Sequence, residues 1–155
     1  MREILFRGFH ECENGTQKAY YNGEWHKGKW VYGYYVPCCL GKFPCVPCIV
    51  PEPDGIWEPI KVAPETVSQY TGVEDKKGKK IFKEDIISAE SLGATLQNGI
   101  VKFGCYRNPY GNHHGYYVYF KSDLIRNDFI YWVKVRGSKV IGNKFENPKL
   151  FGVEE

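Results

Sequence analysis

The sequence predicts a mainly β protein built from short antiparallel strands. The chain has 155 residues, of which 16% are aromatic, with 12 tyrosines, and β-branched and aromatic side chains suit a pleated, half-buried surface. The 17 glycines and 9 prolines interrupt the chain at short intervals. Many short strands separated by close turns favour a barrel or a coiled sandwich. Since we find no internal repeat or low-complexity linker, we expect a single domain over residues 1–155.

The clearest strand signal covers residues 28–36. Trp30, Tyr32 and Tyr34 alternate onto one face, and we expect Trp30 and Tyr32 to face the core. Gly33 inside this run indicates a bulge or a bend. The elements expected before this strand are a short strand at 5–8 and a polar, turn-rich stretch at 10–26, in which Asn14-Gly15 and Asn22-Gly23 indicate tight turns.

Residues 37–53 differ in kind from their surroundings, with four cysteines and five prolines. Repeated proline removes backbone donors and fixes φ, so this stretch is expected to be an inserted loop without a regular strand or helix.

The remainder is expected to alternate strands and turns. Residues 66–71 predict a strand, and residues 75–79 predict a reverse turn with Gly78 at positive φ. The other expected elements are strand pieces at 55–59 and 60–62, strands at 80–82, 84–88, 100–106, 116–120, 129–135 and 139–145, a helical turn at 89–96, a turn at 98–99 and a loop at 107–115.

The formal charge of +3 is weakly basic. It is compatible with nucleic acid but far from the charge of a protein that coats DNA. No apolar run approaches the length of a membrane span, and the N-terminus lacks the apolar segment of a secretory signal. We therefore expect a cytoplasmic protein without membrane association, whose six cysteines are reduced or metal-bound.

Three blocks, in this order, carry a resemblance to a known family: Phe6–Gly8 with Gly28–Tyr34, then Val62–Ile87, then Val140–Leu150. Through them the chain resembles the YopX family of phage and prophage proteins. The resemblance implies coiled β-sheets that include a small SH3-like barrel, and a setting in the cytoplasm of a host cell. It implies no catalytic residues. Family members tend to have Glu-Gly-Asp where this chain has Lys83-Glu84-Asp85, so we expect no obligatory glycine in that turn.

The cysteines of the proline-rich loop are candidate metal ligands. Cys45 and Cys48 form a C-x-x-C pair, and Cys38 or Cys39 would supply further thiolates for zinc. Adjacent cysteines do not easily both ligate one tetrahedral ion. A disulfide and free thiols packed as small hydrophobic groups are the alternatives. We expect no bound zinc and no other cofactor, with thiols partly buried against the aromatic strand.

The densest basic cluster predicts a candidate nucleic-acid contact. Its members are Lys76, Lys77, Lys79, Lys80 and Lys83. Lysines at a hairpin tip can contact phosphates, although a solvated turn is the favoured interpretation because neighbouring carboxylates dilute the positive field.

Three further groups of residues have both a functional and a structural interpretation. The aromatic face of residues 30–34 is either a base-stacking platform or core, and core is favoured. His113 and His114 lie in a predicted loop with Tyr110 and two asparagines, and one of them could face a site. The carboxylates of the most recognisable block, Glu65, Asp75 and Asp85, are candidates for metal-dependent chemistry or plain turn residues.

These observations favour a non-enzymatic interaction module that binds an unidentified host or phage protein. Carboxylates and histidines converging in one deep pocket would count against it. The alternative is a nucleic-acid-binding protein that uses the lysine-rich hairpin and an aromatic sheet face. A small hydrolase or nuclease is the weaker alternative.

Overall fold

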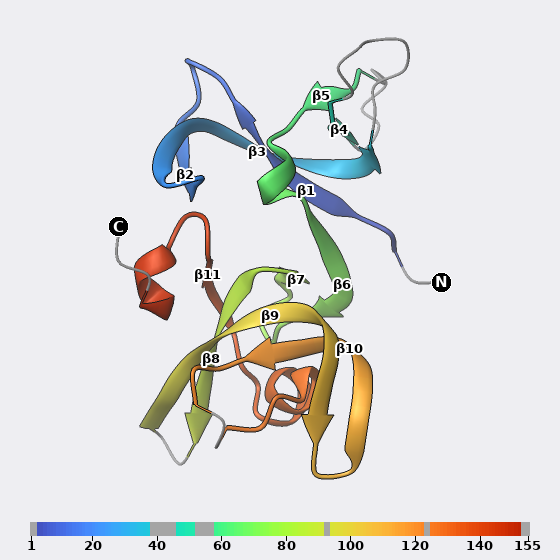
Figure 1. Cartoon of the computed structure of the whole chain (residues 1–155), viewed down its shortest axis with the longest axis vertical. Coiled ribbons are helices and arrows are strands. Elements are labelled where there is room, and N and C mark those ends of the chain that lie inside the picture. Colours follow the sequence, from blue (N-terminus) through green and yellow to red (C-terminus); the bar gives the residue numbers. More distant parts are fainter. Residues whose placement is uncertain (1–2, 38–45, 52–57, 92–93, 123–124, 153–155) are drawn as a thin grey trace. The chain divides into compact units, whose positions relative to one another are not determined.

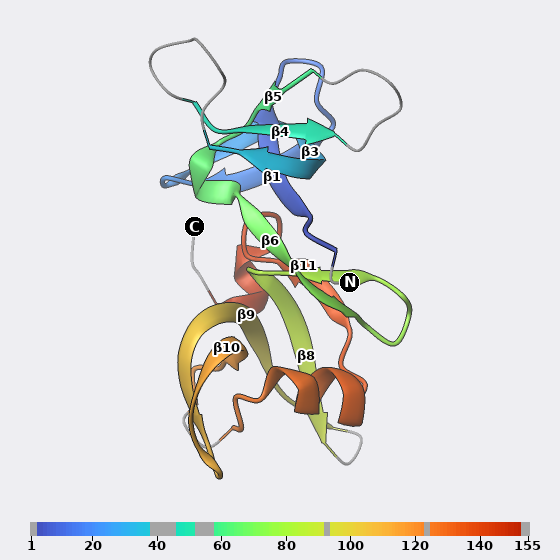
Figure 2. The same cartoon turned by 90° about the vertical axis from the view of Figure 1, so that its right-hand side faces the viewer.

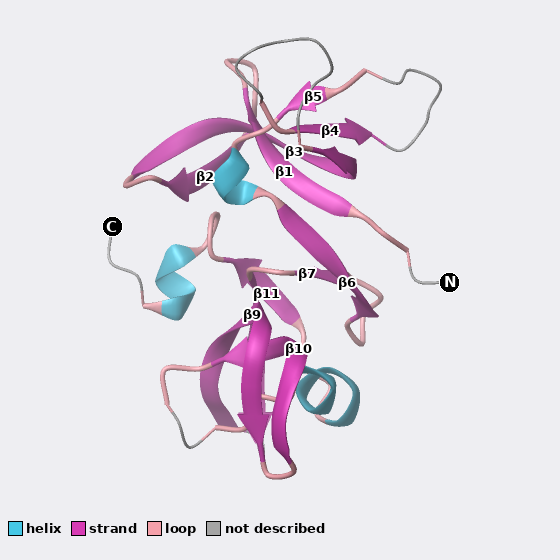
Figure 3. Ribbon diagram, turned by 45° about the vertical axis from the view of Figure 1, so that its right-hand side comes forward, coloured by secondary structure: helices cyan, strands magenta, loops and turns pink. Residues whose placement is uncertain are grey.

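The computed structural model describes residues 3–37, 46–51, 58–91, 94–122 and 125–152 (Figure 1). The chain forms two compact units, Met1–Tyr70 and Thr71–Glu155. Strands predominate in both, and they pair antiparallel (Figure 3). The predicted mainly β, antiparallel fold is confirmed. Within the described residues the strands form open sheets, so the SH3-like barrel stays a prediction, as does the single domain over residues 1–155.

The sheet of the first unit is organised around one long strand, β3 (Glu24–Val36). Its partners are β1 (Phe6–Glu11), β2 (Gln17–Tyr21) and β4 (Cys48–Pro51); β5 (Ile60–Lys61) pairs with β4, and β6 (Ser68–Glu74) pairs with β1. The short 3₁₀ turn η1 (Pro64–Thr66) precedes β6. Val31, Ile49 and Val62 form a buried apolar cluster in this unit.

A tight turn fixes the register between β2 and β3. Asn22 and Gly23 have φ of 53° and 81°, the left-handed pair that a two-residue hairpin turn requires. Tyr21 therefore lies opposite Glu24. The predicted turn at these two residues is confirmed, whereas β2 was missed within the stretch expected to be turns.

The expected loop over residues 37–53 contains a strand, so that expectation is wrong for β4. The four residues of β4 suffice for a short strand. Pro51 occupies the last position, where the lack of a backbone N–H removes little of the strand's hydrogen bonding. At Gly33 the backbones of β3 and β4 approach each other closely. A Cβ at Gly33 would lie 2.0 Å from the carbonyl oxygen of Val50.

The aromatic face of β3 is only partly core. Trp30 is buried, with 8% of its surface exposed, against the ring of Phe9 at 5.4 Å. Tyr32 is 47% exposed, so the prediction that both residues face the core is right for Trp30 and wrong for Tyr32. The side chains of the strand alternate between its faces as expected, but on this face the core covers Trp30 and does not extend to Tyr32.

The second unit contains a four-stranded sheet of order β10-β9-β8-β11. Its strands are β8 (Asp85–Ser91), β9 (Ala94–Asn108), β10 (Gly111–Tyr119) and β11 (Val140–Asn143), and β7 (Lys80–Phe82) follows β6 in the other sheet. The helical elements of this unit are the π-helix η2 (Tyr131–Val135) and the 3₁₀ turn η3 (Pro148–Phe151). Trp132 and Val133 of η2 pack with Val101 and Val118 in the main core cluster. η2 is the orange coil in the lower part of Figure 2.

Residues 89–91 and 94–99 are strand where a helical turn and a reverse turn were expected. β8 continues through Ser91, and Gly99 lies inside β9. Gly99 serves packing rather than turning. A Cβ there would lie 2.3 Å from Val118 Cγ1 and 2.6 Å from Phe120 Cε1, distances that side chains do not tolerate.

Two other expectations in this unit are wrong. The predicted loop over residues 107–115 is a hairpin in which β9 and β10 pair up to Asn108 and Gly111. The predicted strand over residues 129–135 is η2, because a short apolar run does not by itself distinguish a buried strand from a buried helix. No helix formed by the described residues is long and apolar enough to cross a membrane.

Candidate functional site

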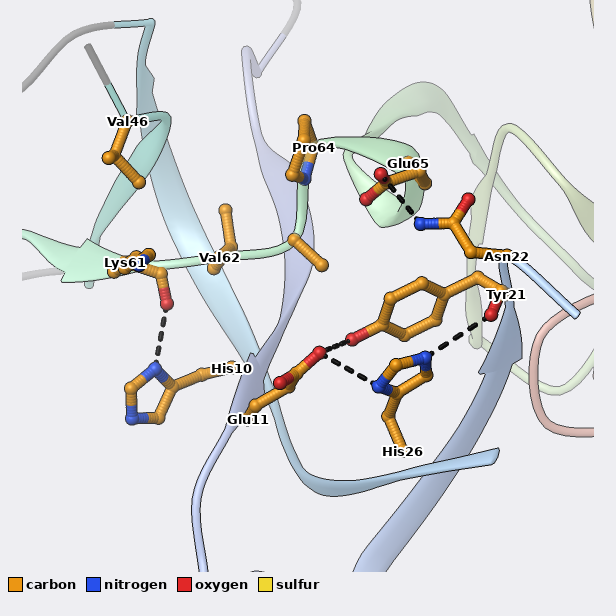
Figure 4. A pocket seen from close by; sticks show the side chains of 11 residues that line it. His10, Glu11, Tyr21, Asn22, His26, Val46, Lys61, Val62, Pro64 and Glu65 are labelled. Carbon is orange, nitrogen blue, oxygen red and sulfur yellow. Dashed lines mark hydrogen bonds and ion pairs between the residues drawn. The ribbon is translucent and has the colours of Figure 1, made fainter. Parts of the chain in front are cut away.

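A cavity of about 410 Å³ lies in the first unit, bordered by the end of β1, the β2–β3 hairpin and the chain after β5 (Figure 4). Its polar lining is His10, Glu11, Tyr21, Asn22, His26, Lys61 and Glu65, and its apolar lining is Val46, Val62, Ala63 and Pro64. Histidines and carboxylates thus meet in one cavity.

Glu11 is the centre of one side of the cavity. Its Oε1 accepts a hydrogen bond from the Tyr21 hydroxyl and lies 2.9 Å from His26 Nδ1. The rings of Tyr21 and His26 stack with centroids 3.8 Å apart. Burial, together with the bond to Glu11 and its charge, raises the pKa of Tyr21 well above its ordinary value, so this phenol stays protonated at neutral pH.

His26 is fully engaged by acceptors. Its Nε2 lies 3.2 Å from the backbone oxygen of Tyr21, and its Nδ1 lies against Glu11. Both contacts are hydrogen bonds only when the ring carries a proton on each nitrogen. His26 therefore has no unoccupied nitrogen with which to act as a general base.

Glu65 stands on the opposite side of the cavity, in η1. Asn22 Nδ2 donates to its Oε1 at 2.9 Å. This bond, with one from the backbone, lowers the pKa of Glu65, so its side chain is a carboxylate at neutral pH. Within the described part of the chain, no Lys, Arg or His side chain lies within ion-pair distance of Glu65.

His10 borders the cavity next to β5. Its Nδ1 lies 2.7 Å from the Lys61 carbonyl oxygen, which can only accept, so Nδ1 carries the proton. The ring is thereby oriented by the backbone. In Figure 4 its second nitrogen points away from Glu11 and His26.

Around Glu11, the hydrogen-bonding capacity that is left is that of an acceptor. Tyr21, His26 and Asn22 each donate to an acceptor within the protein. Among the described residues, Oε2 of Glu11 receives no hydrogen bond. No group of three or more His, Cys, Asp or Glu residues with metal-binding geometry occurs among the residues that the structure describes.

Sequence reasoning missed most of this cavity, although one signal was available. The two-residue turn at Asn22 and Gly23 fixes the register of the hairpin, and it makes Tyr21 and His26 diagonal neighbours on one face. Their contact with Glu11 joins a more distant strand, β1, whose register the sequence does not specify.

The lysines singled out from the sequence surround a turn that carboxylates organise. Lys76, Lys77 and Lys79 are exposed in the turn between β6 and β7, while Lys80 and Lys83 are half-buried. Asp75 Oδ1 accepts from the amides of Lys77 and Lys79, and Oδ2 accepts from Val140. Burial alone would raise the pKa of Asp75, but these backbone bonds hold it below its ordinary value. Nucleic-acid binding by these lysines stays a prediction.

The carboxylate of Glu84 forms ion pairs with three lysines in the second unit. Its carboxylate lies 2.7 Å from Lys102 Nζ, 3.2 Å from Lys144 Nζ and 3.9 Å from Lys83 Nζ, and its side chain is almost enclosed. Its φ is +71°, so this position has the left-handed backbone that favours glycine although a glutamate occupies it.

The cysteine predictions are tested at one position of the proline-rich loop. Cys48 is disulfide-bonded, so the expectation of a reduced or metal-bound cysteine is wrong there. Cys38, Cys39 and Cys45 lie outside the described residues, and the absence of zinc at these four cysteines stays a prediction. Cys12 and Cys105 are free thiols.

His113 and His114 lie on opposite faces of β10, as their adjacency predicts. His113 Nε2 is 2.9 Å from Asn108 Oδ1, and Asn108 Nδ2 donates to Asp128 Oδ1 at 2.7 Å. Burial would raise the pKa of Asp128, but the bonds from Asn108 and Arg126 hold it below its ordinary value. This network is structural in character, since each polar group in it has an internal partner.

The candidate carboxylates do not form one site. Glu65 lines the cavity of the first unit, while Asp75 and Asp85 lie in the second. Asp85 is buried at the start of β8, where it accepts the amide of Phe82 at 2.8 Å.

Comparison with known proteins gives one family and one solved structure. No curated protein matches the chain. The solved structure is protein EF1440 from Enterococcus faecalis, at 17% identity and a TM-score of 0.46, with 97% of this chain and 99% of that chain covered. The family model described as YopX protein matches residues 48–152, a range that includes the second and third sequence blocks. The chain belongs to the YopX family.

Proposed function

We propose that the first unit is a non-catalytic protein-interaction module whose cavity receives a cationic side chain, Lys or Arg, of a partner protein. One observation carries this proposal: Tyr21, Asn22 and His26 each donate within the protein, while one oxygen of Glu11 receives no hydrogen bond and Glu65 has no ion-pair partner among the described residues. A ligand that supplies donors and positive charge complements such a lining.

The apolar part of the lining supports the same ligand. Val46, Val62, Ala63 and Pro64 offer a surface for the aliphatic stem of a long basic side chain, whose head then reaches the carboxylates. Glu65 is the stronger anchor, because Oε1 of Glu11 already contacts both the Tyr21 hydroxyl and His26 Nδ1. Resemblance to phage and prophage proteins suggests a phage or host protein as the source of that side chain.

The convergence of histidines and carboxylates counts towards an enzyme and against a pure interaction module. We nonetheless favour binding over catalysis. Both nitrogens of His26 face acceptors, and the raised pKa of Tyr21 keeps its phenol from acting as a nucleophile at neutral pH.

The test is a titration with acetyl-arginine amide, monitored by NMR chemical shifts of the cavity residues. We expect weak, saturable, millimolar binding, and a loss of most of the affinity in Glu65→Gln. Acetyl-citrulline amide, which has the same shape without the charge, is the ligand control. Glu58→Gln removes an exposed carboxylate outside the cavity lining and is the protein control.

Equal binding of the arginine and citrulline compounds, or undiminished binding by Glu65→Gln, would overturn the proposal. Binding should also weaken at acid pH. The pKa of Glu65 is lowered, so the carboxylate persists through the usual titration range of a glutamate and protonates only below it. An affinity capture from phage-infected host cells, with Glu65→Gln as the matched bait, then identifies the partner.

A further inference from the structure

The β9–β10 hairpin of the second unit ends in a section in which large hydrophobic side chains are exposed instead of being buried in the core. Its two strands pair from Ile100 with Tyr119 out to Asn108 with Gly111, and the turn lies at the bottom of Figures 1 and 2. Near the base of this stretch, Val101 and Val118 are fully buried. Beyond them, Phe103 is 51% exposed and Tyr110 in the turn is 82% exposed.

The charge of this hairpin is of one sign. Residues 91–122 contain no Asp or Glu, but they contain Lys102, Arg107, Lys121 and two histidines. Lys102 is paired with Glu84. Arg107 is exposed and forms no ion pair with any residue that the structure describes, so its charge is available to a ligand.

One face of the hairpin is filled by its own rings. Tyr106 stacks on His113 at 5.5 Å and on Tyr117 at 5.6 Å. Gly104 and Gly115 lie opposite each other between these pairs, and the absence of side chains there lets the two tyrosines meet. This stack stiffens the hairpin and leaves the opposite face to carry a ligand.

The opposite face combines an exposed ring with the free guanidinium. Alternation along the strands places Phe103, Arg107 and His114 on it. Phe103 is fixed by T-shaped contacts at 5.0 Å to each of His114 and Tyr116, and yet half of its surface is exposed. The exposed ring of Phe103 can stack on a base, and the guanidinium of Arg107 can contact the phosphate of that nucleotide. Neither strand carries a carboxylate that would repel the phosphate.

We propose that this face, defined by Phe103, Arg107, Asn112 and His114, binds single-stranded nucleic acid. A base stacks on Phe103, and a neighbouring phosphate contacts Arg107. Stacking requires an unpaired base, and every base has a ring face, so the binding is selective for single strands and tolerant of sequence. This site is independent of the cavity in the first unit and of the lysine turn at residues 76–80.

The test is fluorescence anisotropy of the full chain with a labelled twelve-residue oligothymidine at several salt concentrations. We expect Phe103→Ala to weaken binding about tenfold at every salt concentration. Arg107→Ala should weaken it and reduce the slope of log affinity against log salt by about one. Both side chains are exposed, so circular dichroism of the variants should match that of the unchanged protein.

Two matched controls separate this face from other candidates. Tyr32→Ala removes an aromatic side chain of similar exposure from the first unit, and Lys77→Ala removes a cation from the lysine turn. Both should bind as the unchanged protein does. The proposal is overturned if the oligonucleotide does not bind, if Phe103→Ala binds normally, or if Lys77→Ala alone weakens binding. Equal affinity for a duplex of the same length would also overturn it.

Discussion

Glu11 in the first unit and Glu84 in the second are both carboxylates at the centre of a cluster, but their surroundings differ. Glu11 receives a phenol and an imidazole on one oxygen, at the edge of an open cavity. Glu84 is almost enclosed and is held by three lysines. The comparison shows that a cluster of titratable groups indicates a binding site only where some hydrogen-bonding capacity is left over, as at Glu11. At Glu84 that capacity is used within the fold.

Removal of the enclosed carboxylate should have the largest effect. Glu84→Ala leaves Lys102 and Lys144 without their counter-charge, and we expect the free energy of unfolding to fall by about 2–4 kcal/mol. The estimate allows for the partial exposure of both lysines. Urea denaturation measures it, with Glu90→Ala as a control that removes an exposed carboxylate of β8. A change as small as that of the control would place Glu84 among ordinary surface charges.

Asp75 is an enclosed carboxylate of another kind, bound by backbone amides rather than by lysines. Asp75→Ala should lower the free energy of unfolding by about 2–3 kcal/mol at neutral pH, because three amides lose their acceptor. The folded pKa is depressed, so the contribution is complete above the unfolded value of about 3.9 and is lost as pH falls through the folded pKa. Denaturation at a series of pH values should show the two proteins converging below about pH 4; a constant difference would refute this assignment.

The backbone at Glu84 separates strain from charge. Its φ of +71° suits glycine, so Glu84→Gly should be more stable than Glu84→Ala by about 1 kcal/mol, although neither restores the ion pairs. The two midpoints of urea denaturation give this difference directly. Equal stability would mean that the turn relaxes when the side chain is lost.

The open cluster should respond least. Tyr21→Phe removes one hydroxyl from Glu11, which keeps His26 and the space of the cavity, so we expect a loss of at most about 1 kcal/mol. Thermal unfolding of the two proteins measures it. A loss of several kcal/mol would indicate that the cluster around Glu11 supports the fold as Glu84 does.

The sequence predicted features that depend on local chemistry. The tight turn at Asn22 and Gly23, the turn at Gly78 and the strand around Trp30 follow from backbone preference and alternation. Features that depend on distant neighbours were not predicted. The segment over residues 129–135 is a helix because Trp132 and Val133 reach a core that β9 and β10 complete.

The cavity illustrates the same limit. The pairing of Tyr21 with His26 could be deduced from the turn length, but the contribution of Glu11 depends on β1, and that of Glu65 depends on η1. The exposure of Tyr32 was equally out of reach, because alternation indicates which face a side chain shares and not where the covering of that face ends.

The packing of Gly99 has a consequence for how sequences of this family are compared. Val118 and Phe120 fill the space beside it, so packing alone excludes any residue with a side chain at this position. No ligand is needed to explain the glycine. A column of unchanging glycine at this position would therefore record steric exclusion. Variation among relatives would be informative at Phe103 and Glu65, where the fold itself permits replacement.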